Sequence, residues 1–291
     1  MPTFRFVTVD VFTDRRFGGN PLAVFPDARG ISDTDMQALA AEFNLSETTF
    51  VLPPADPKNS ARVRIFSRTR EMAFAGHPNV GTAWVLAQEG RAKGGKLRFE
   101  EIAGLVDVTV EGEIVTIQAP QPLQLEQEMP VDLLAGCVGL TAGDVVVASH
   151  RPVIASHGNS FVVAELTGEA LGRAKPDPAR FQAAHAQFSH LGPNRLPLYL
   201  YARNGENRLR TRMFAPLSGS TEDAATGSAA TPLASLLLSL GKDQKRRFEI
   251  VQGVEMGRPS LLITTAWRAA DGIRASVGGS CVPVLAGEAT V

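Results

Sequence analysis

The sequence contains only two cysteines, Cys137 and Cys281, in 291 residues. Two cysteines cannot form a disulfide framework, and the absence of a CxxC pair excludes the usual zinc and redox motifs. The sequence also has no excess of charge of either sign, since 29 Lys and Arg face 30 Asp and Glu. This balance argues against nucleic acid and anionic membranes as partners, because both favour a basic excess.

Long hydrophobic runs are also missing. The longest, around 233–240, is interrupted by Ser235 and Ser239 and is too short to span a membrane. The first residues alternate between apolar and polar and carry Arg5 and Asp10, which is unlike a signal peptide. We therefore expect a soluble, cytoplasmic protein.

Cofactor motifs are absent as well. There is no P-loop and no Gly-rich dinucleotide turn after a predicted strand, and the five histidines show no metal-ligand spacing with nearby carboxylates. The sequence therefore predicts no cofactor and no bound metal.

The composition is that of a globular protein with a normal core: 44% of residues are hydrophobic and 20% are charged. The length allows one large or two modest domains. Because 27 glycines and 19 prolines supply many turns, we expect many short strands.

Hydrophobic periodicity predicts short strands alternating with helices. One helix should begin after Ser32, with Asp35 placed as in a capping box, and end at Asn44. The predicted strands are 4–12, 22–25, 48–52, 62–66, 96–100, 105–110 and 114–118, and further helices are predicted at 79–89 and, after a loop at 172–180, at 181–190.

The second half of the chain repeats the plan of the first. Residues 62–66 (RVRIF) resemble 210–214 (RTRMF), and an apolar helix is predicted in each half, at 80–88 and 231–240. Three landmarks recur 151 residues later, namely Glu71, Gly76 and Gly90 as Glu222, Gly227 and Gly241. The repeat predicts two similar β-rich domains, each folded around a central helix, with a boundary near 118–122.

Candidate chemistry lies near the starts of these central helices. Gly76 and Gly227 would leave helix N-terminal N–H groups open to an anionic ligand; the alternative is that they simply cap a buried helix. Asp223 could bind a substrate or cap the second helix. Glu47 could act as an acid or base or be solvated, and His77 could hydrogen-bond a carboxylate or lie at the surface.

Six segments resemble the phenazine-biosynthesis isomerase (PhzF-like) family, which has the diaminopimelate-epimerase fold. They occur in family order over nearly the whole chain, and those of the second half are most similar to the dihydrohydroxyanthranilate isomerase branch. The segments are 19–24 (GNPLAV), 44–48 (NLSET), 74–78 (FAGHP), 212–216 (RMFAP), 222–229 (EDAATGSA) and 252–260 (QGVEMGRPS).

The resemblance implies an α+β fold of two pseudo-symmetric domains, each a mixed β-barrel around a central α-helix, with the site in the cleft. The first domain would span 1–120 and be completed by 280–291, and the second would span 121–279. The resemblance also implies a homodimer. By motif, the catalytic residues would be Glu47, His77 and Asp223, and the substrate-binding residues Asn20, Ser46, Gly76, Gly227 and Ser228.

Two positions depart from the epimerases of this fold, which carry a cysteine before each central helix. Here these positions are Ala75 and Thr226, and Cys137 and Cys281 lie in other motifs. A two-thiol racemase is therefore not expected, since the thiolate pair is its chemistry. Further departures, at Thr231 and 279–281, bear on the substrate and not on the fold.

Together these features predict a cofactor-independent isomerase that shifts a proton and a double bond in a small cyclic amino or hydroxy acid. The resemblance favours trans-2,3-dihydro-3-hydroxyanthranilate, in phenazine biosynthesis. Two alternatives remain open: a PhzF-like isomerase or epimerase of another small carboxylated metabolite, and a non-catalytic anion-binding protein of the same fold.

Overall fold

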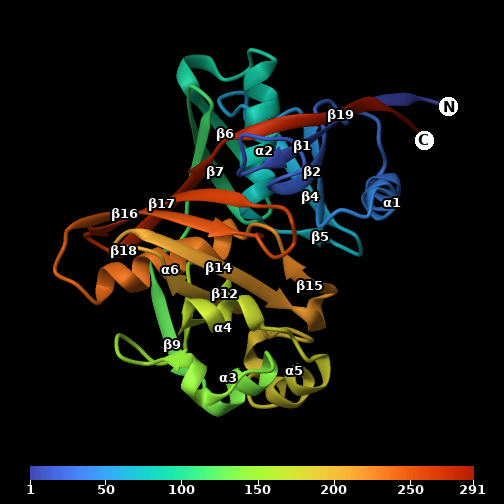
Figure 1. Cartoon of the computed structure of the whole chain (residues 1–291). Helices are drawn as coiled ribbons and strands as arrows, with labels where there is room; N and C mark the ends of the chain where they lie inside the picture. Colours follow the sequence, from blue (N-terminus) through green and yellow to red (C-terminus); the bar gives the residue numbers. More distant parts are fainter. The chain divides into compact units, whose positions relative to one another are not determined.

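The computed structural model describes all 291 residues, which form two compact units (Figure 1). The first comprises Met1–Gln118 and Val277–Val291, and the second Ala119–Ser276. Both contain strands and helices, so each unit is α+β.

The first unit contains eleven elements in chain order, the last of which comes from the end of the sequence. They are β1 (Thr3–Val11), β2 (Asn20–Phe25), α1 (Asp33–Phe43), β3 (Glu47–Leu52), β4 (Ala61–Ser67), β5 (Glu71–Met72), α2 (Gly76–Gln88), β6 (Lys96–Glu101), β7 (Gly104–Glu111), β8 (Ile114–Gln118) and β19 (Cys281–Thr290).

The second unit has more helices, and the chain leaves it within β18 (Gly272–Gly279). Its other elements are β9 (Gln124–Glu128), α3 (Val131–Cys137), β10 (Val145–Val146), β11 (Val153–Ser156), β12 (Ser160–Leu166), α4 (Gly168–Arg173), α5 (Pro178–His185), β13 (Leu198–Arg203), β14 (Arg208–Ala215), β15 (Ser220–Asp223), α6 (Gly227–Ser239), β16 (Lys245–Gln252) and β17 (Ser260–Ala269).

Strand pairing confirms the internal repeat. In the first unit β2 and β3 are parallel, β3 and β4 antiparallel, and β4 and β6 parallel. In the second, β12 and β13, β13 and β14, and β14 and β16 show the same directions. The register agrees too, because Phe66 lies opposite Glu71 and Phe214 lies opposite Glu222.

Strand β19 completes the sheet of the first unit from the far end of the sequence. It pairs antiparallel with β1, from Thr3 opposite Thr290 to Val11 opposite Cys281, with one irregularity between Thr8 and Val9. The other edge of β1 is paired with β2, also antiparallel. Backbone hydrogen bonds therefore tie the two ends of the sequence into one unit.

The central helices α2 and α6 are buried nearly all round. Ten of the thirteen residues of α2 and eleven of the thirteen of α6 are buried, which is typical of a helix inside a core. Both begin earlier than the sequence predicted, at Gly76 and Gly227. In α2 the first turn includes Pro78, which a helix tolerates there because the first N–H groups have no intrahelical partner.

The helices outside the sheets follow local capping signals. As predicted, Ser32 caps α1 by accepting from the Asp35 N–H, and left-handed Asn44 ends it. The helix predicted at 181–190 is present but shifted, because α5 runs from Pro178 to His185, and the predicted loop at 172–180 begins with the last residues of α4. Thr167 and Asp177 cap these helices, and Pro178 occupies the first turn of α5.

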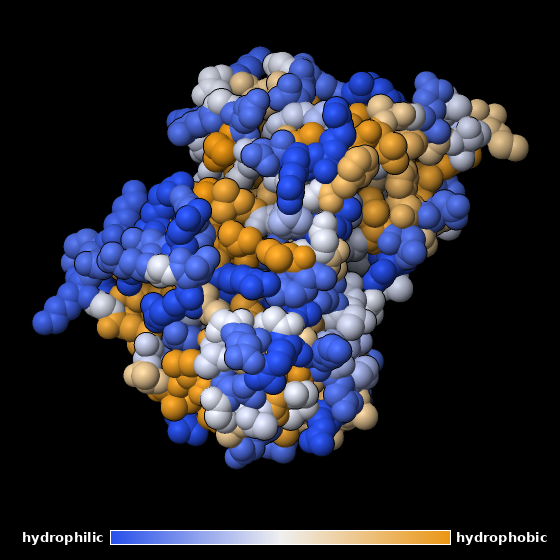
Figure 2. Space-filling model, in the orientation of Figure 1, coloured by the Kyte–Doolittle hydropathy of each residue, from blue (hydrophilic) through white to orange (hydrophobic).

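The basic run 242–247 (KDQKRR) connects α6 to β16. Its side chains are exposed except for half-buried Arg246, and the part of the surface at the left of Figure 2, where Figure 1 shows β16 and the end of α6, is hydrophilic. The run is therefore solvated, and its last three residues already belong to β16.

None of the helices combines the length and the apolar composition that crossing a membrane requires.

Close packing of α2 on the sheet gives a stability prediction. A Cβ on Gly81 would lie 2.6 Å from Leu22 Cδ2 and 2.8 Å from Val11 Cγ2, and both side chains are fully buried. We expect Gly81→Ala to lower the free energy of unfolding by about 1–2 kcal/mol, since overpacking outweighs the gain in helix propensity. Urea unfolding measures this, and Gly172→Ala, where nothing lies within 4 Å of the added methyl, is the control that should not destabilise.

Candidate active site

Glu47 and His77 meet in the first unit. Glu47 is the first residue of β3 and His77 the second residue of α2. Glu47 Oε2 lies 3.4 Å from His77 Nε2, and the two side chains are 16% and 7% exposed. The structure therefore places the predicted carboxylate beside the predicted histidine in a largely buried setting.

Asn20 and Ser46 determine which nitrogen of His77 carries the proton. The Ser46 hydroxyl donates to Asn20 Oδ1 over 3.4 Å, and the Asn20 amide nitrogen is on the side of His77. That nitrogen lies 3.3 Å from His77 Nδ1 and donates to it. The proton of a neutral ring is then on Nε2, where it faces Glu47.

Burial also fixes the charge of His77. Loss of solvation lowers the pKa of His77 to about 3, so the ring is neutral at physiological pH. A neutral imidazole can donate a hydrogen bond to the Glu47 carboxylate without placing a positive charge beside it. The 3.4 Å contact between the two side chains does not have hydrogen-bond geometry, but it places a carboxylate beside a neutral ring and leaves that carboxylate able to act as the base.

The first turn of α2 lies next to this pair in sequence. Its N-cap residue, Ala75, has no side-chain cap, and Asn79 Nδ2 donates to the Ala75 carbonyl over 3.0 Å. Gly76 begins the helix, so its N–H is among those without an intrahelical partner. Such N–H groups favour a carboxylate or another anion.

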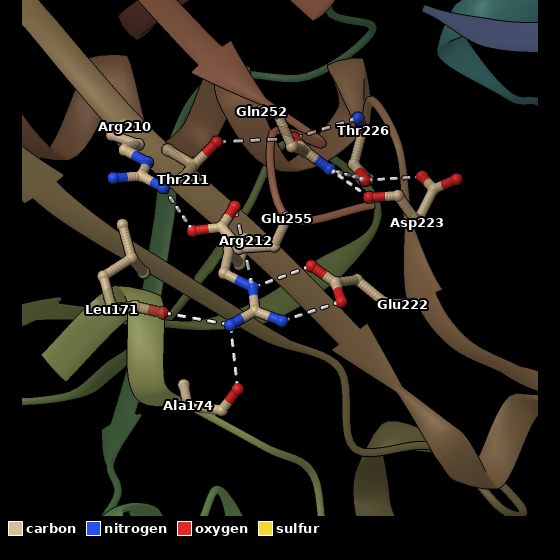
Figure 3. A network of polar contacts seen from close by, with 10 residues as sticks. All are labelled: Leu171, Ala174, Arg210, Thr211, Arg212, Glu222, Asp223, Thr226, Gln252 and Glu255. Atoms are coloured by element: carbon tan, nitrogen blue, oxygen red, sulfur yellow. Dashed lines mark hydrogen bonds and ion pairs between the residues drawn. The ribbon is translucent and has the colours of Figure 1, made fainter. Parts of the chain in front are cut away.

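In the second unit, Asp223 ends β15 just before α6. Its Oδ2 accepts from the Thr226 hydroxyl over 2.6 Å. Buried Gln252 fixes this loop: its amide donates to the Asp223 carbonyl and to Thr226 Oγ1, while its Oε1 accepts from the Thr226 N–H (Figure 3). The same Oε1 also accepts from the Tyr199 hydroxyl. Gly227 and Ser228 then start the helix.

A buried arginine holds the strand before each central helix. In the second unit Arg212 makes a two-pronged ion pair with Glu222, at 2.8 and 2.9 Å, and donates to the carbonyls of Leu171 and Ala174 (Figure 3). Its guanidinium also lies over the Phe214 ring, 4.7 Å from the centroid. The residues that the repeated RxRxF segments share thus serve as structural anchors.

The first unit contains the same device. Arg64 binds both carboxylate oxygens of Glu71 at 2.7 Å, also pairs with Asp33, and lies over the Phe66 ring. These hydrogen bonds raise the pKa of Arg64. The sequence repeat is therefore also a repeat of specific contacts.

Within each unit the predicted site residues gather as expected from the motifs. Asn20, Ser46, Glu47 and His77 form one network with Gly76 close by in sequence, and Asp223, Gly227 and Ser228 flank the start of α6. Their roles in catalysis and substrate binding stay predictions. Sequence reasoning missed Gln252, because a buried amide that binds a loop far along the chain has no local spacing.

The positions that carry cysteines in thiol-dependent epimerases are the N-cap residues here, Ala75 and Thr226. Both cysteines are buried elsewhere, and burial raises the pKa of Cys137 to about 11 and that of Cys281 further. Thiolate is the reactive form, so we expect iodoacetamide to leave both unmodified in the native protein, with turnover unchanged. Mass spectrometry together with an activity assay checks this; full alkylation that abolishes turnover of folded protein would contradict it.

The two pseudo-symmetric α+β units, each wrapped around a buried helix, define the class of protein: the diaminopimelate-epimerase-like fold, as predicted. The PhzC-PhzF family model, described as phenazine biosynthesis-like protein, matches residues 9–287. The chain belongs to this family, and it is an isomerase.

Relatives and solved structures agree over the full length. The chain is 36% identical to an uncharacterized isomerase of Mesorhizobium japonicum, covering 99% of both chains. It is 36% identical to the trans-2,3-dihydro-3-hydroxyanthranilate isomerase of Pseudomonas aeruginosa, covering 98% of this chain and 99% of that one. A PhzF-family phenazine biosynthesis protein of Bacillus anthracis superposes with a TM-score of 0.90 at 23% identity, covering 100% of each.

Proposed function

We propose that this isomerase works without a cofactor and moves a proton, and with it a double bond, within a small cyclic carboxylated substrate. The observation that carries the proposal is the pair formed by Glu47 and a neutral His77. A carboxylate that lies beside a neutral ring N–H and has little exposure to solvent is suited to take up and return a proton.

Glu47 is the proton carrier in this mechanism. Its carboxylate removes a proton from one ring carbon and becomes a carboxylic acid, while the C–H electron pair forms a new double bond. The former double bond shifts, and the distal carbon accepts the proton from Glu47. Proton and electrons balance within substrate and carboxyl group, so the step needs no oxidant or reductant.

His77 and the start of α2 would orient the reactants. The ring of His77 does not ionise near neutral pH, so its Nε2–H remains available to donate a hydrogen bond to Glu47 or to a polar group of the substrate. The N–H groups at Gly76 suit the substrate carboxylate. The low exposure of the Glu47 side chain, 16%, helps it to retain the proton between the two transfers.

The best candidate substrate is trans-2,3-dihydro-3-hydroxyanthranilate. The relative of Pseudomonas aeruginosa that carries this name matches the chain over nearly its full length. On this substrate Glu47 would take the proton from C3 and return it to C1, which gives an enol that relaxes to a ketone. Asp223, Gly227 and Ser228 are proposed to bind the same substrate, and the homodimer is likewise a proposal.

Incubation of the purified protein with this substrate tests the proposal. We expect substrate consumption that survives dialysis against a chelator, and, in D₂O, deuterium at the carbon that gains the proton to the extent that Glu47 exchanges with solvent. Turnover that a metal must restore would overturn the mechanism. Turnover of another cyclic amino or hydroxy acid in place of this one would retain the mechanism and replace the substrate.

A further inference from the structure

The carboxyl group of Glu101, at the end of β6, is buried without a role in the mechanism above. Neither of its oxygens has a hydrogen-bond partner, and neither does Oδ1 of Asn79 in α2. The Asn79 amide lowers the pKa of the Glu101 carboxyl, as a nearby N–H donor does, so the two side chains lie close together. An ionised carboxylate could not satisfy Asn79 Oδ1, because both groups are acceptors, whereas a protonated carboxyl could donate to it.

The internal repeat gives Glu101 a counterpart in the second unit. Strands β6 and β16 pair parallel to β4 and β14, with Phe99 opposite Ala61 and Ile250 opposite Leu209. Two residues further along each strand is its last residue, Glu101 in β6 and Gln252 in β16. These positions are 151 residues apart, the same spacing that relates the repeated landmarks.

Gln252 shows what this position does. Its carboxamide donates to the Asp223 carbonyl and accepts from the Thr226 N–H, which fixes the loop that enters α6. A neutral carboxylic acid has one donor and one acceptor and can replace a carboxamide in such a contact, but a carboxylate has no donor.

Contacts around Glu101 lead to the equivalent loop in the first unit. The Ala103 N–H, two residues after Glu101, donates to the Ala73 carbonyl over 3.1 Å. Asn79 Nδ2 donates to the Ala75 carbonyl over 3.0 Å. Asn79 therefore connects the Glu101 carboxyl to the residue before Gly76 and His77.

We propose that Glu101 is a positioning residue that remains protonated at neutral pH and donates to Asn79 Oδ1, thereby fixing the first turn of α2 and the His77 ring. Gln252 holds the start of α6 in the corresponding way. The catalytic consequence rests on the function proposed for His77, but the protonation of Glu101 does not.

The surroundings of Glu101 favour its neutral form. Burial raises the pKa of Glu101 to about 8, against a smaller lowering by Asn79. The charged groups on the neighbouring elements have other partners. Glu100 of β6 accepts from Asn59 and lies near Arg62 of β4. Glu71 of β5 pairs with Arg64, Asp107 of β7 pairs with Arg98, and His77 of α2 is neutral.

This protonation makes stability depend on pH in a defined direction. Between about pH 4.5 and 8 the folded protein keeps a proton on Glu101 that the unfolded chain has lost. Stability is therefore greatest, as far as this group is concerned, at low pH and falls as pH rises through this window. Above about pH 8 the folded protein also loses the proton, and the hydrogen bond to Asn79 is lost with it.

Glu101→Gln tests the proposal because it supplies a permanent donor of the same shape. We expect the Tm of the wild type to fall more steeply from pH 5 to pH 8 than that of Glu101→Gln. We also expect kcat of the wild type to fall up to tenfold per pH unit above about pH 8, and this fall to be absent in the variant. Glu111→Gln, an exposed carboxylate on β7, is the control and should retain both wild-type profiles.

Infrared difference spectra provide a readout on the wild type itself, whether or not a variant folds. A protonated-carboxyl C=O band present at pH 7 and lost above about pH 8, and missing in Glu101→Gln, is expected. Spectra without such a band, or identical Tm profiles for wild type and Glu101→Gln, would overturn the proposal. If no substrate is turned over, the proposed function fails, while the Tm and infrared results still decide the role of Glu101.

Discussion

Glu47→Gln is expected to lower kcat by about 10²–10⁴-fold, the usual contribution of a positioned general base. The amide keeps the size of the side chain and most of its hydrogen bonding, but it cannot accept the proton. Substrate binding should change little, because the groups proposed to hold the substrate carboxylate are backbone N–H groups near Gly76. Steady-state kinetics with a separate binding measurement gives both numbers.

Glu42→Gln is the matched control for this substitution, since it removes an exposed carboxylate of α1 in the same unit. It should leave kcat and binding unchanged. His77→Ala and Asp223→Asn should cost less in kcat and more in binding than Glu47→Gln, because their proposed work is orientation. Near-normal turnover by folded Glu47→Gln would end the single-carboxylate mechanism.

Arg212→Met is expected to be the most damaging substitution for stability, by about 3–5 kcal/mol. The Arg212 and Glu222 side chains are only 8% and 14% exposed, so the variant leaves a buried carboxylate without its partner. It also removes the donors to the carbonyls of Leu171 and Ala174, which anchor the end of α4. Denaturant unfolding followed by circular dichroism measures the loss.

Arg64→Met makes the equivalent change in the first unit and serves as the comparison. Here the partners are more exposed, 25% for Glu71 and 81% for Asp33, so water can replace more of the lost contacts. We expect a smaller loss of about 1–3 kcal/mol. Equal effects of the two substitutions would show that burial of the ion pair does not set its contribution.

Most elements of the first unit could be predicted from the sequence because their signals are local, whereas most strands of the second unit were not predicted. The alternation in β1 and the Ser32 and Asn44 signals that bound α1 each depend on neighbouring residues. The spacing of 151 residues revealed the duplication, and the segments around Glu47 and His77 identified the residues that the structure brings together.

Features that depend on distant contacts could not be predicted in this way. Helix α2, which is buried nearly all round, begins at Gly76, earlier than the local pattern indicated. The helix at 181–190 was misplaced because the Asp177 cap and Pro178 were not recognised as a start signal. The tie between Gln252 and the Asp223 loop joins residues 29 apart through side chains. The equivalence of Glu101 and Gln252 in the two repeats could be detected from their spacing. That both residues end corresponding strands became clear only from the strand registers.

The pairing of β1 with β19 has a consequence for biosynthesis. The ribosome makes β19 only after all of Ala119–Ser276, so the nascent first unit waits with one edge of β1 unpaired while the second unit, a continuous segment, can fold. An open strand edge is a site for wrong pairing with other chains. The segment synthesised first is thus the one completed last, and its open edge stays exposed to wrong pairing until β19 has been made.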